Sequence, residues 1–176
     1  LLNPYALLVG VFTVAGAAMH GTIFLYLKTE GDLQARIHRW MWITFAIFMV
    51  LYVAVTAATL VSVPHAVDNF SHLPVAWVVV ALNALAVANI PRAIYRGEPR
   101  YAFASSSATI AALVFLAAMA IFPYLAPSSL DPAYGLDIYG AASSTGTLKL
   151  MAIIAAIGMP FVLTYTAVIY WVFRGK

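Results

Sequence analysis

Between Trp40 and Val63 the chain reads WMWITFAIFMVLYVAVTAATLVSV, and no residue in this stretch carries a charge. Four more stretches share its apolar character: Tyr5–Leu27, Leu73–Ile94, Ala102–Leu125 and Leu148–Phe173. Two of these four contain one basic residue near an end. The hydrocarbon core of a bilayer is about 30 Å thick, which about 20 residues of helix can cross. The sequence therefore predicts an all-α, polytopic membrane bundle of five transmembrane helices, formed as one bundle by residues 1–176.

The composition of the chain agrees with a membrane protein. Apolar residues make up 64% of the chain and charged residues 9%, against averages of about 45–50% and about 25% in soluble domains. A soluble protein of this size has too little interior to bury that much apolar surface. The chain has no cysteine, which excludes disulfides, iron–sulfur clusters and thiolate chemistry.

The basic residues predict the orientation of the chain in the membrane. Eight of the nine fall on one predicted side: Lys28, Arg36, Arg39, Arg92, Arg96, Arg100, Arg174 and Lys176. Only Lys149 falls toward the other side. By the positive-inside rule, the N-terminus lies outside and the C-terminus in the cytoplasm. The basic charge thus reflects topology, and we expect no nucleic-acid partner.

Local signals refine the helices. Asn3 is expected to cap the first helix, with Pro4 in its first turn. Ala17 and Gly21 form a small-residue pair that lets another helix approach closely. Residues 28–36 are expected to form a turn and a short amphipathic segment before the second helix begins at Trp40. Within the fifth stretch, Gly158-Met159-Pro160 predicts a break and a kink.

Two polar residues inside apolar stretches are the candidate site residues, His20 and Asn83. Ionisable groups at membrane depth are costly and suggest function, but a neutral histidine bonded to another helix is the commoner case. Asn83 either joins helices by hydrogen bonds or lines a polar path, and the first role is the commoner one.

His20 is also a candidate haem ligand. Ligation by two histidines is not expected, because His38, His65 and His72 fall in predicted loops or at interfaces. Ligation by His20 with Met41 or Met159 is conceivable from sequence. We expect no catalytic residue, no metal site and no directly bound cofactor, because the sequence contains no catalytic triad, carboxylate pair, phosphate loop or metal-spaced cluster.

Three parts of the chain carry a family resemblance. They are LNPYALLVG (2–10) with Gly21 and KTEGDL (28–33); FPYLAPSSLDPA (122–133) with AASS (141–144), TLK (147–149) and Met151; and Tyr165-Thr166 with YWVFRGK (170–176). In this order they resemble the C-terminal half of subunit II of cytochrome bd-type quinol oxidases. The resemblance implies that the chain is the second half of a longer subunit, and the opening Leu1-Leu2 without an initiator Met fits this expectation.

The resemblance implies a function for the complex rather than for this chain alone. The complex would oxidise quinol, reduce dioxygen to water and build a proton gradient in the respiratory chain of a bacterial inner membrane. Its b-type and d-type haems would belong to subunit I, the haem-bearing partner. The chain would be the supporting non-haem subunit, in contact with membrane lipid and quinone and with a small accessory subunit as a further candidate partner.

Two alternatives from other classes stay open on the sequence. One is a small transporter in which the break at Pro160 and Asn83 line a substrate site. The other is a shortened membrane scaffold subunit with a structural role only.

Overall fold

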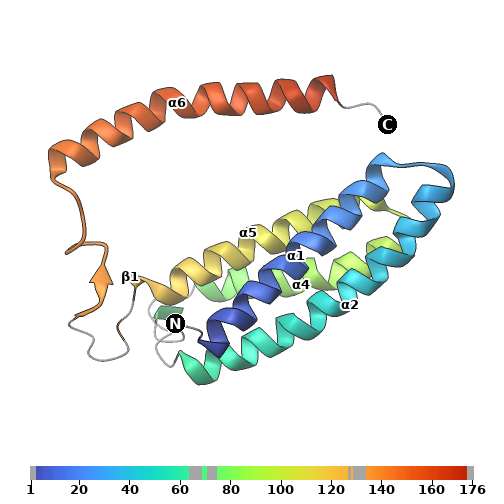
Figure 1. The fold of residues 1–176 in the computed structure, drawn as a ribbon, viewed down its shortest axis with the longest axis horizontal. Coiled ribbons are helices and arrows are strands. Elements are labelled where there is room, and N and C mark those ends of the chain that lie inside the picture. Colours follow the sequence, from blue (N-terminus) through green and yellow to red (C-terminus); the bar gives the residue numbers. More distant parts are fainter. Residues whose placement is uncertain (1–2, 64–68, 71–74, 127, 129–133, 174–176) are drawn as a thin grey trace. The chain divides into compact units, whose positions relative to one another are not determined.

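The structure is a computed structural model that describes residues 3–63, 69–70, 75–126, 128 and 134–173 (Figure 1). The chain divides into two compact units, Leu1–Phe122 and Pro123–Lys176. The described part contains five helices long and apolar enough to cross a membrane, which confirms the predicted number of transmembrane helices. The prediction that all five form one bundle stays a prediction.

The first unit contains four long helices (Figure 1): α1 (Pro4–Lys28), α2 (Gly31–Ser62), α4 (Val75–Tyr95) and α5 (Pro99–Ile121). Helix α1 packs against α2 and α5, and α4 packs along α5. Even the shortest of the four has 21 residues, about 31 Å of helix at 1.5 Å per residue. Each helix is therefore long enough to cross the hydrocarbon core of a bilayer.

The chain turns tightly between these helices. The side-chain oxygen of Asn3 accepts a hydrogen bond from the Tyr5 backbone N–H at 2.9 Å, as predicted for the start of α1. Only Thr29 and Glu30 separate α1 from α2, and Gly31 follows with a φ of +64° that favours glycine. Helix α4 ends at Tyr95, and Gly97 follows with a φ of +68°; the N–H groups of Gly97 and Glu98 bond back to the carbonyls of Ile94 and Ala93, respectively. This pattern is a Schellman motif, which satisfies carbonyls at the end of the helix.

The predicted start of the second helix at Trp40 is wrong. Helix α2 begins at Gly31 and includes the segment that was expected to be a turn and a separate amphipathic piece. Ile37 in this segment is buried against the core, and the side-chain amide of Gln34 donates to the Tyr26 carbonyl at 3.2 Å. Its charged residues face outward from a continuous helix, so their polarity does not interrupt it.

The other helix ends differ from the predictions by a few residues. Helix α4 agrees closely with the predicted 73–94, although Leu73 lies outside the described residues. Helix α5 ends at Ile121 rather than Leu125, because the chain turns at Phe122-Pro123 and continues into a short strand. The predicted boundary at Leu125 followed an apolar run that extends beyond the helix itself.

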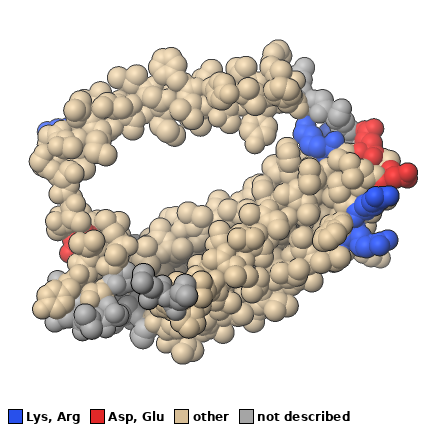
Figure 2. Space-filling view, in the orientation of Figure 1, with Lys and Arg blue, Asp and Glu red and all other residues tan. Residues whose placement is uncertain are grey.

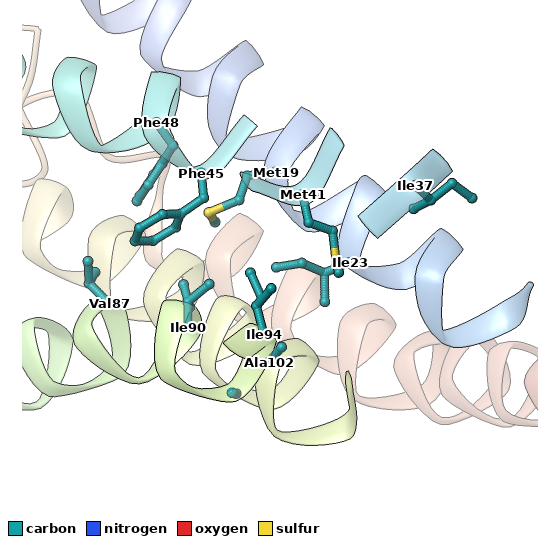
Figure 3. Close-up of a cluster of buried hydrophobic side chains, with 11 residues drawn as sticks. Met19, Ile23, Ile37, Met41, Phe45, Phe48, Val87, Ile90, Ile94 and Ala102 are labelled. Carbon is teal, nitrogen blue, oxygen red and sulfur yellow. The ribbon is translucent and has the colours of Figure 1, made fainter. Parts of the chain in front are cut away.

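The core of the first unit is an apolar cluster between its four helices (Figure 3). Its members are Met19, Ile23, Ile37, Met41, Phe45, Phe48, Val87, Ile90, Ala93, Ile94 and Ala102. Lipid tails are as apolar as these side chains, so close packing rather than the hydrophobic effect holds such helices together. The outer surfaces carry large exposed apolar side chains, among them Val14 and Val50, as expected for a surface that faces lipid.

The close approach of α1 and α2 uses small residues other than the predicted pair. Ala15 and Gly16 are buried, whereas Ala17 is exposed. A Cβ atom on Gly16 would lie 3.7 Å from Cε2 of Phe48, so the Phe48 ring packs directly over this glycine. The sequence identified a small-residue surface on α1, but one residue of offset turns a helix by about 100° and moves the contact to the next face.

The second unit contains a short antiparallel pair of strands and one long helix. Strand β1 (Tyr124–Ala126) pairs with β2 (Leu136–Asp137), a small addition to the predicted all-α fold. Helix α6 (Thr145–Val172) begins where Ser144 accepts from the Thr147 backbone N–H at 3.3 Å. The helix continues through Pro160, so the predicted break is wrong, and the predicted kink stays a prediction. A proline removes one helical hydrogen bond, and a long membrane helix can tolerate that loss.

Candidate functional site

His20 links α1 to α5 through a hydrogen bond and a ring contact. Its Nδ1 lies 2.8 Å from Oγ of Ser106, which is fully buried. Its imidazole ring stacks on the Phe103 ring, with centroids 4.9 Å apart and planes at 28°. The part-buried histidine is thus held on its face by an aromatic ring and on one edge by a hydroxyl.

The partners of Ser106 determine which nitrogen of His20 carries the proton. Ser106 Oγ also lies 2.9 Å from the Phe103 carbonyl oxygen and donates to it. A serine hydroxyl has a single proton to donate, so toward His20 it accepts. We therefore assign the proton of a neutral His20 to Nδ1, which leaves Nε2 as a hydrogen-bond acceptor.

Asn83 connects three helices from a buried position. Its side chain is 1% exposed. The Tyr52 hydroxyl of α2 donates to Asn83 Oδ1, and Asn83 Nδ2 donates to the Thr109 carbonyl of α5, each at 3.5 Å. Both distances are longer than the usual values for such bonds, by about half an ångström for the N–H donor and about three-quarters of an ångström for the O–H donor. Asn83 therefore sits in a polar environment whose hydrogen bonds are loose.

The two candidate residues meet the same face of α5. Ser106 contacts His20 and Thr109 contacts Asn83. Residues three apart in a helix share a face and are separated by about 4.5 Å along its axis. No hydrogen bond joins His20 directly to Asn83 among the described residues. We call His20, Tyr52, Asn83, Ser106 and Thr109 the polar cluster.

Sequence reasoning found two members of the polar cluster and missed three. His20 and Asn83 stood out because they interrupt apolar stretches, whereas Tyr52, Ser106 and Thr109 did not. A usable signal for two of them was present: Ser106 and Thr109 are three apart within an Ala-rich helix. Their partners could not be deduced, because the order in which the helices pack is not readable from the sequence.

A second polar contact between α4 and α5 lies near the end where basic residues gather. Asn89 Nδ2 donates to Ser105 Oγ at 2.7 Å, and Arg92 donates to Asn89 Oδ1. Figure 2 shows Lys and Arg side chains at the end of the first unit where α1 joins α2 and α4 joins α5. Arg92 is exposed there, so its charge is not enclosed by the bundle.

The His–Met haem arrangement considered for His20 does not fit the first unit. Met41 is 2% exposed and its side chain points to Ile23 within the apolar core (Figure 3). The hollow beside Met41 and Tyr26 has no room for even a water molecule, whereas small-molecule sites hold roughly 300–1,000 Å³. Met159 belongs to the second unit, so its position does not test ligation by His20 with Met159.

Ligation by two histidines does not fit the first unit either. His38 lies within helix α2, not in a loop, and its ring contacts that of Tyr26 at 5.6 Å. Tyr26 is six residues beyond His20 on α1, about 9 Å along the helix, so the two histidines are too far apart to share one iron. His65 and His72 lie outside the described residues.

Over the described ranges, no group of three His, Cys, Asp or Glu side chains is arranged to hold a metal ion. The expected absence of a metal site and of a catalytic residue stays a prediction. The polar cluster contains one imidazole, one amide and three hydroxyls. Such groups can donate and accept hydrogen bonds between helices.

The fold and the polar cluster define a class of protein. The chain is a multi-pass α-helical membrane protein, with five helices long and apolar enough to cross a bilayer. Hydrogen bonds between polar side chains on neighbouring helices join the helices of the first unit.

Comparison with known sequences assigns the family. The sequence model of cytochrome bd terminal oxidase subunit II matches residues 1–173. The chain belongs to this family. Five spanning helices and this membership make it a multi-pass protein of the bacterial inner membrane.

Curated relatives carry corresponding names. The chain is 28% identical over 206 residues to cytochrome bd-I ubiquinol oxidase subunit 2 of Escherichia coli K12, covering 100% of this chain and 53% of that protein. It is 32% identical over 180 residues to cytochrome bd ubiquinol oxidase subunit 2 of Bacillus subtilis, covering 99% and 51%. A probable cytochrome oxidase subunit 2 of Haemophilus influenzae is 30% identical over 193 residues, covering 94% and 50%. The chain spans about half the length of these relatives and matches their C-terminal half.

Proposed function

We propose that this chain is part of the non-haem subunit II of a bd-type terminal oxidase. The complex would oxidise quinol, reduce dioxygen to water and contribute to a proton gradient in an aerobic respiratory chain. The observation that carries the proposal is the family match over residues 1–173, together with relatives that are named ubiquinol oxidase subunits. Because the chain spans about half of those relatives, the activity is proposed for the assembled complex.

We infer that the haems b and d of the complex are bound by the partner, subunit I. This is supported by the poor fit of a haem to the first unit. Met41 points into the apolar core, and His38 is too far along the helices to share an iron with His20. The role proposed for this chain is to support and stabilise the haem-bearing subunit.

The polar cluster is proposed to hold the helices in register. His20 bonds α1 to α5, and Asn83 bonds α2, α4 and α5. In lipid, interhelical hydrogen bonds add to close packing in holding helices together. Neither residue is proposed to take part in chemistry.

The orientation with the N-terminus outside and the C-terminus in the cytoplasm is also a proposal. It is supported by six basic residues at the ends of the helices of the first unit where α1 joins α2 and α4 joins α5: Lys28, Arg36, Arg39, Arg92, Arg96 and Arg100. Cytoplasmic loops carry such an excess of positive charge. Contacts with lipid, with quinone and with a small accessory subunit are proposed on family resemblance alone.

The transporter alternative has lost one of its two supports. It required a broken fifth helix, and α6 continues through Pro160. Asn83, the other support, bonds to neighbouring helices. The scaffold alternative differs from our proposal in predicting no oxidase activity in the complex.

The proposal is tested by purifying the intact complex through a tag on this subunit and measuring oxygen consumption with a reduced quinol. We expect quinol-dependent oxygen uptake that remains with the tagged subunit through purification. A haem-bearing oxidase that purifies fully active without this subunit would contradict the proposed supporting role.

A further inference from the structure

The threonines of α1 and α2 share one way of satisfying their hydroxyl groups. Each donates to a backbone carbonyl three or four residues earlier in its own helix, at 2.7–2.9 Å. They are Thr13, Thr22, Thr44, Thr56 and Thr59. This bond is the ordinary solution for a threonine in an apolar helix, because it uses an acceptor that is always within reach.

Thr109, the threonine of α5, departs from this pattern. Its side chain is fully buried, and its Oγ1 has no hydrogen-bond partner among the described residues. A buried hydroxyl without a partner loses its hydration and gains nothing in return. Native structures nearly always provide a partner for such a group, either from the protein or from an ordered water.

The side chain that contacts the Thr109 backbone, Asn83, also has unused bonding capacity. Asn83 Nδ2 reaches the Thr109 carbonyl at 3.5 Å, and Asn83 Oδ1 receives the Tyr52 hydroxyl at 3.5 Å. An amide side chain has two donor hydrogens and two acceptor lone pairs, so Asn83 uses half of its capacity, and does so at long range. An unsatisfied hydroxyl and an under-used amide thus belong to two buried residues that contact each other.

We propose that a single buried water molecule binds between Thr109 Oγ1 and the Asn83 side chain and joins α4 to α5. A water accepts and donates at once, as a hydroxyl and an amide together require. Buried waters typically bond to about three otherwise unsatisfied groups, and Tyr52 can supply the third. Because Thr109, Asn83 and Tyr52 are uncharged, the site suits a neutral ligand rather than an ion. This inference does not depend on the proposed oxidase function.

The direct test is a density map of the complete, unmodified complex that is sharp enough to show ordered waters. We expect a peak within about 3 Å of both Thr109 Oγ1 and an Asn83 side-chain atom. The proposal is overturned if no peak lies there, or if Thr109 Oγ1 instead bonds to a carbonyl of its own helix as the other threonines do.

The unfolding temperatures of Thr109 variants of the complete complex provide an independent test. Thr109→Val keeps the side-chain shape and removes the hydroxyl, and Thr109→Ser keeps the hydroxyl. If the water is present, Thr109→Val lowers the unfolding temperature because the water loses a partner. Thr109→Ser keeps the hydroxyl, so the density map of that variant retains the water peak. With a truly unsatisfied hydroxyl, Thr109→Val raises the unfolding temperature, and that rise would overturn the proposal.

The matched control is Thr56→Val. Thr56 is exposed and its hydroxyl bonds to the Tyr52 carbonyl of its own helix at 2.7 Å. The change in unfolding temperature of Thr56→Val measures the effect of removing a threonine hydroxyl that needs no water. The change in unfolding temperature of Thr109→Val is compared with it. If Thr109→Val prevents assembly, the density map of the unmodified complex decides the question alone.

Discussion

At the residue scale, the contact between His20 and Ser106 predicts which nitrogen of the imidazole contributes to the stability of the bundle. The protonated Nδ1 donates to Ser106 Oγ. The amide nitrogen of asparagine lies close to the position of histidine Nδ1, whereas that of glutamine lies closer to Nε2. We therefore expect His20→Asn to keep the bond and the stability of the bundle, and His20→Gln and His20→Leu to lose them. The measurement is the free energy of unfolding in detergent–lipid micelles.

The size of this effect follows from a double-mutant cycle of His20→Leu with Ser106→Ala. Interhelical hydrogen bonds in membranes contribute about 0.6 kcal/mol on average, so we expect a coupling energy of that order. The control cycle pairs His20→Leu with Ser107→Ala, because Ser107 bonds to the Phe103 carbonyl and not to His20. Equal coupling in the two cycles would show that the His20–Ser106 bond contributes nothing specific.

At this scale the sequence predicts which residues are unusual but not what they touch. A histidine and an asparagine within apolar stretches are visible in the sequence, and a hydrogen-bonded role was the favoured interpretation for both. Their partners lie 86 and 26 residues away along the chain. Which hydroxyl contacts which side chain depends on the face that each of α1, α4 and α5 turns toward its neighbours. A rotation of one helix by a single residue changes that face.

At the element scale, the early start of α2 makes a prediction about residues 31–39. Ala35 is exposed in the second turn of this helix. Proline there removes a helical N–H and clashes with the preceding turn, which costs about 3 kcal/mol. Glycine costs about 1 kcal/mol relative to alanine. We expect Ala35→Pro to destabilise the complete subunit clearly more than Ala35→Gly, as measured by thermal unfolding.

The same pair of variants has the opposite outcome if residues 31–39 form a loop. In that case proline is tolerated at least as well as glycine, since it limits the unfolded chain and breaks no helical bond. Similar unfolding temperatures for Ala35→Pro and Ala35→Gly would contradict the continuous helix.

Helix existence was predictable at this scale, while helix ends were less so. All five predicted helices are found, because an apolar stretch of membrane length has one common structure in lipid. The charges of residues 28–39 placed the predicted start of α2 too late in the chain. A helix that leaves the membrane becomes amphipathic without ending. The apolar run beyond Ile121 extended the prediction for α5 into β1. Apolar character marks what lies in lipid, and it does not mark where helical hydrogen bonds stop.

At the scale of the whole molecule, the proposed orientation predicts which segments face each side of the membrane. Residues 1–176 contain no cysteine, so single cysteines can be introduced without background labelling from this chain. Tyr139→Cys is expected to react with a membrane-impermeant thiol reagent in intact cells. Arg96→Cys is expected to react only after the cells are permeabilised. Both positions are exposed, and the reverse pattern would overturn the orientation.

The membrane class and the family were predictable at this scale, and the assembly was not. Length and composition alone gave the spanning helices, and short motifs spread through the chain gave the family, which the match over residues 1–173 confirms. How the helices meet a partner is not encoded in any local pattern. Outward-facing apolar side chains such as Val14 and Val50 suit lipid and another protein equally well.

The central claim is that this chain belongs to the subunit that supports a haem-bearing partner in a bd-type oxidase. The most direct test is a reduced-minus-oxidised visible spectrum of the intact complex purified through a tag on this subunit, recorded for the unmodified protein and for His20→Asn. We predict bands of both b-type and d-type haem, unchanged in the variant. An intact preparation without haem would contradict the oxidase assignment, and loss of a haem band in His20→Asn would contradict the non-haem role of this chain.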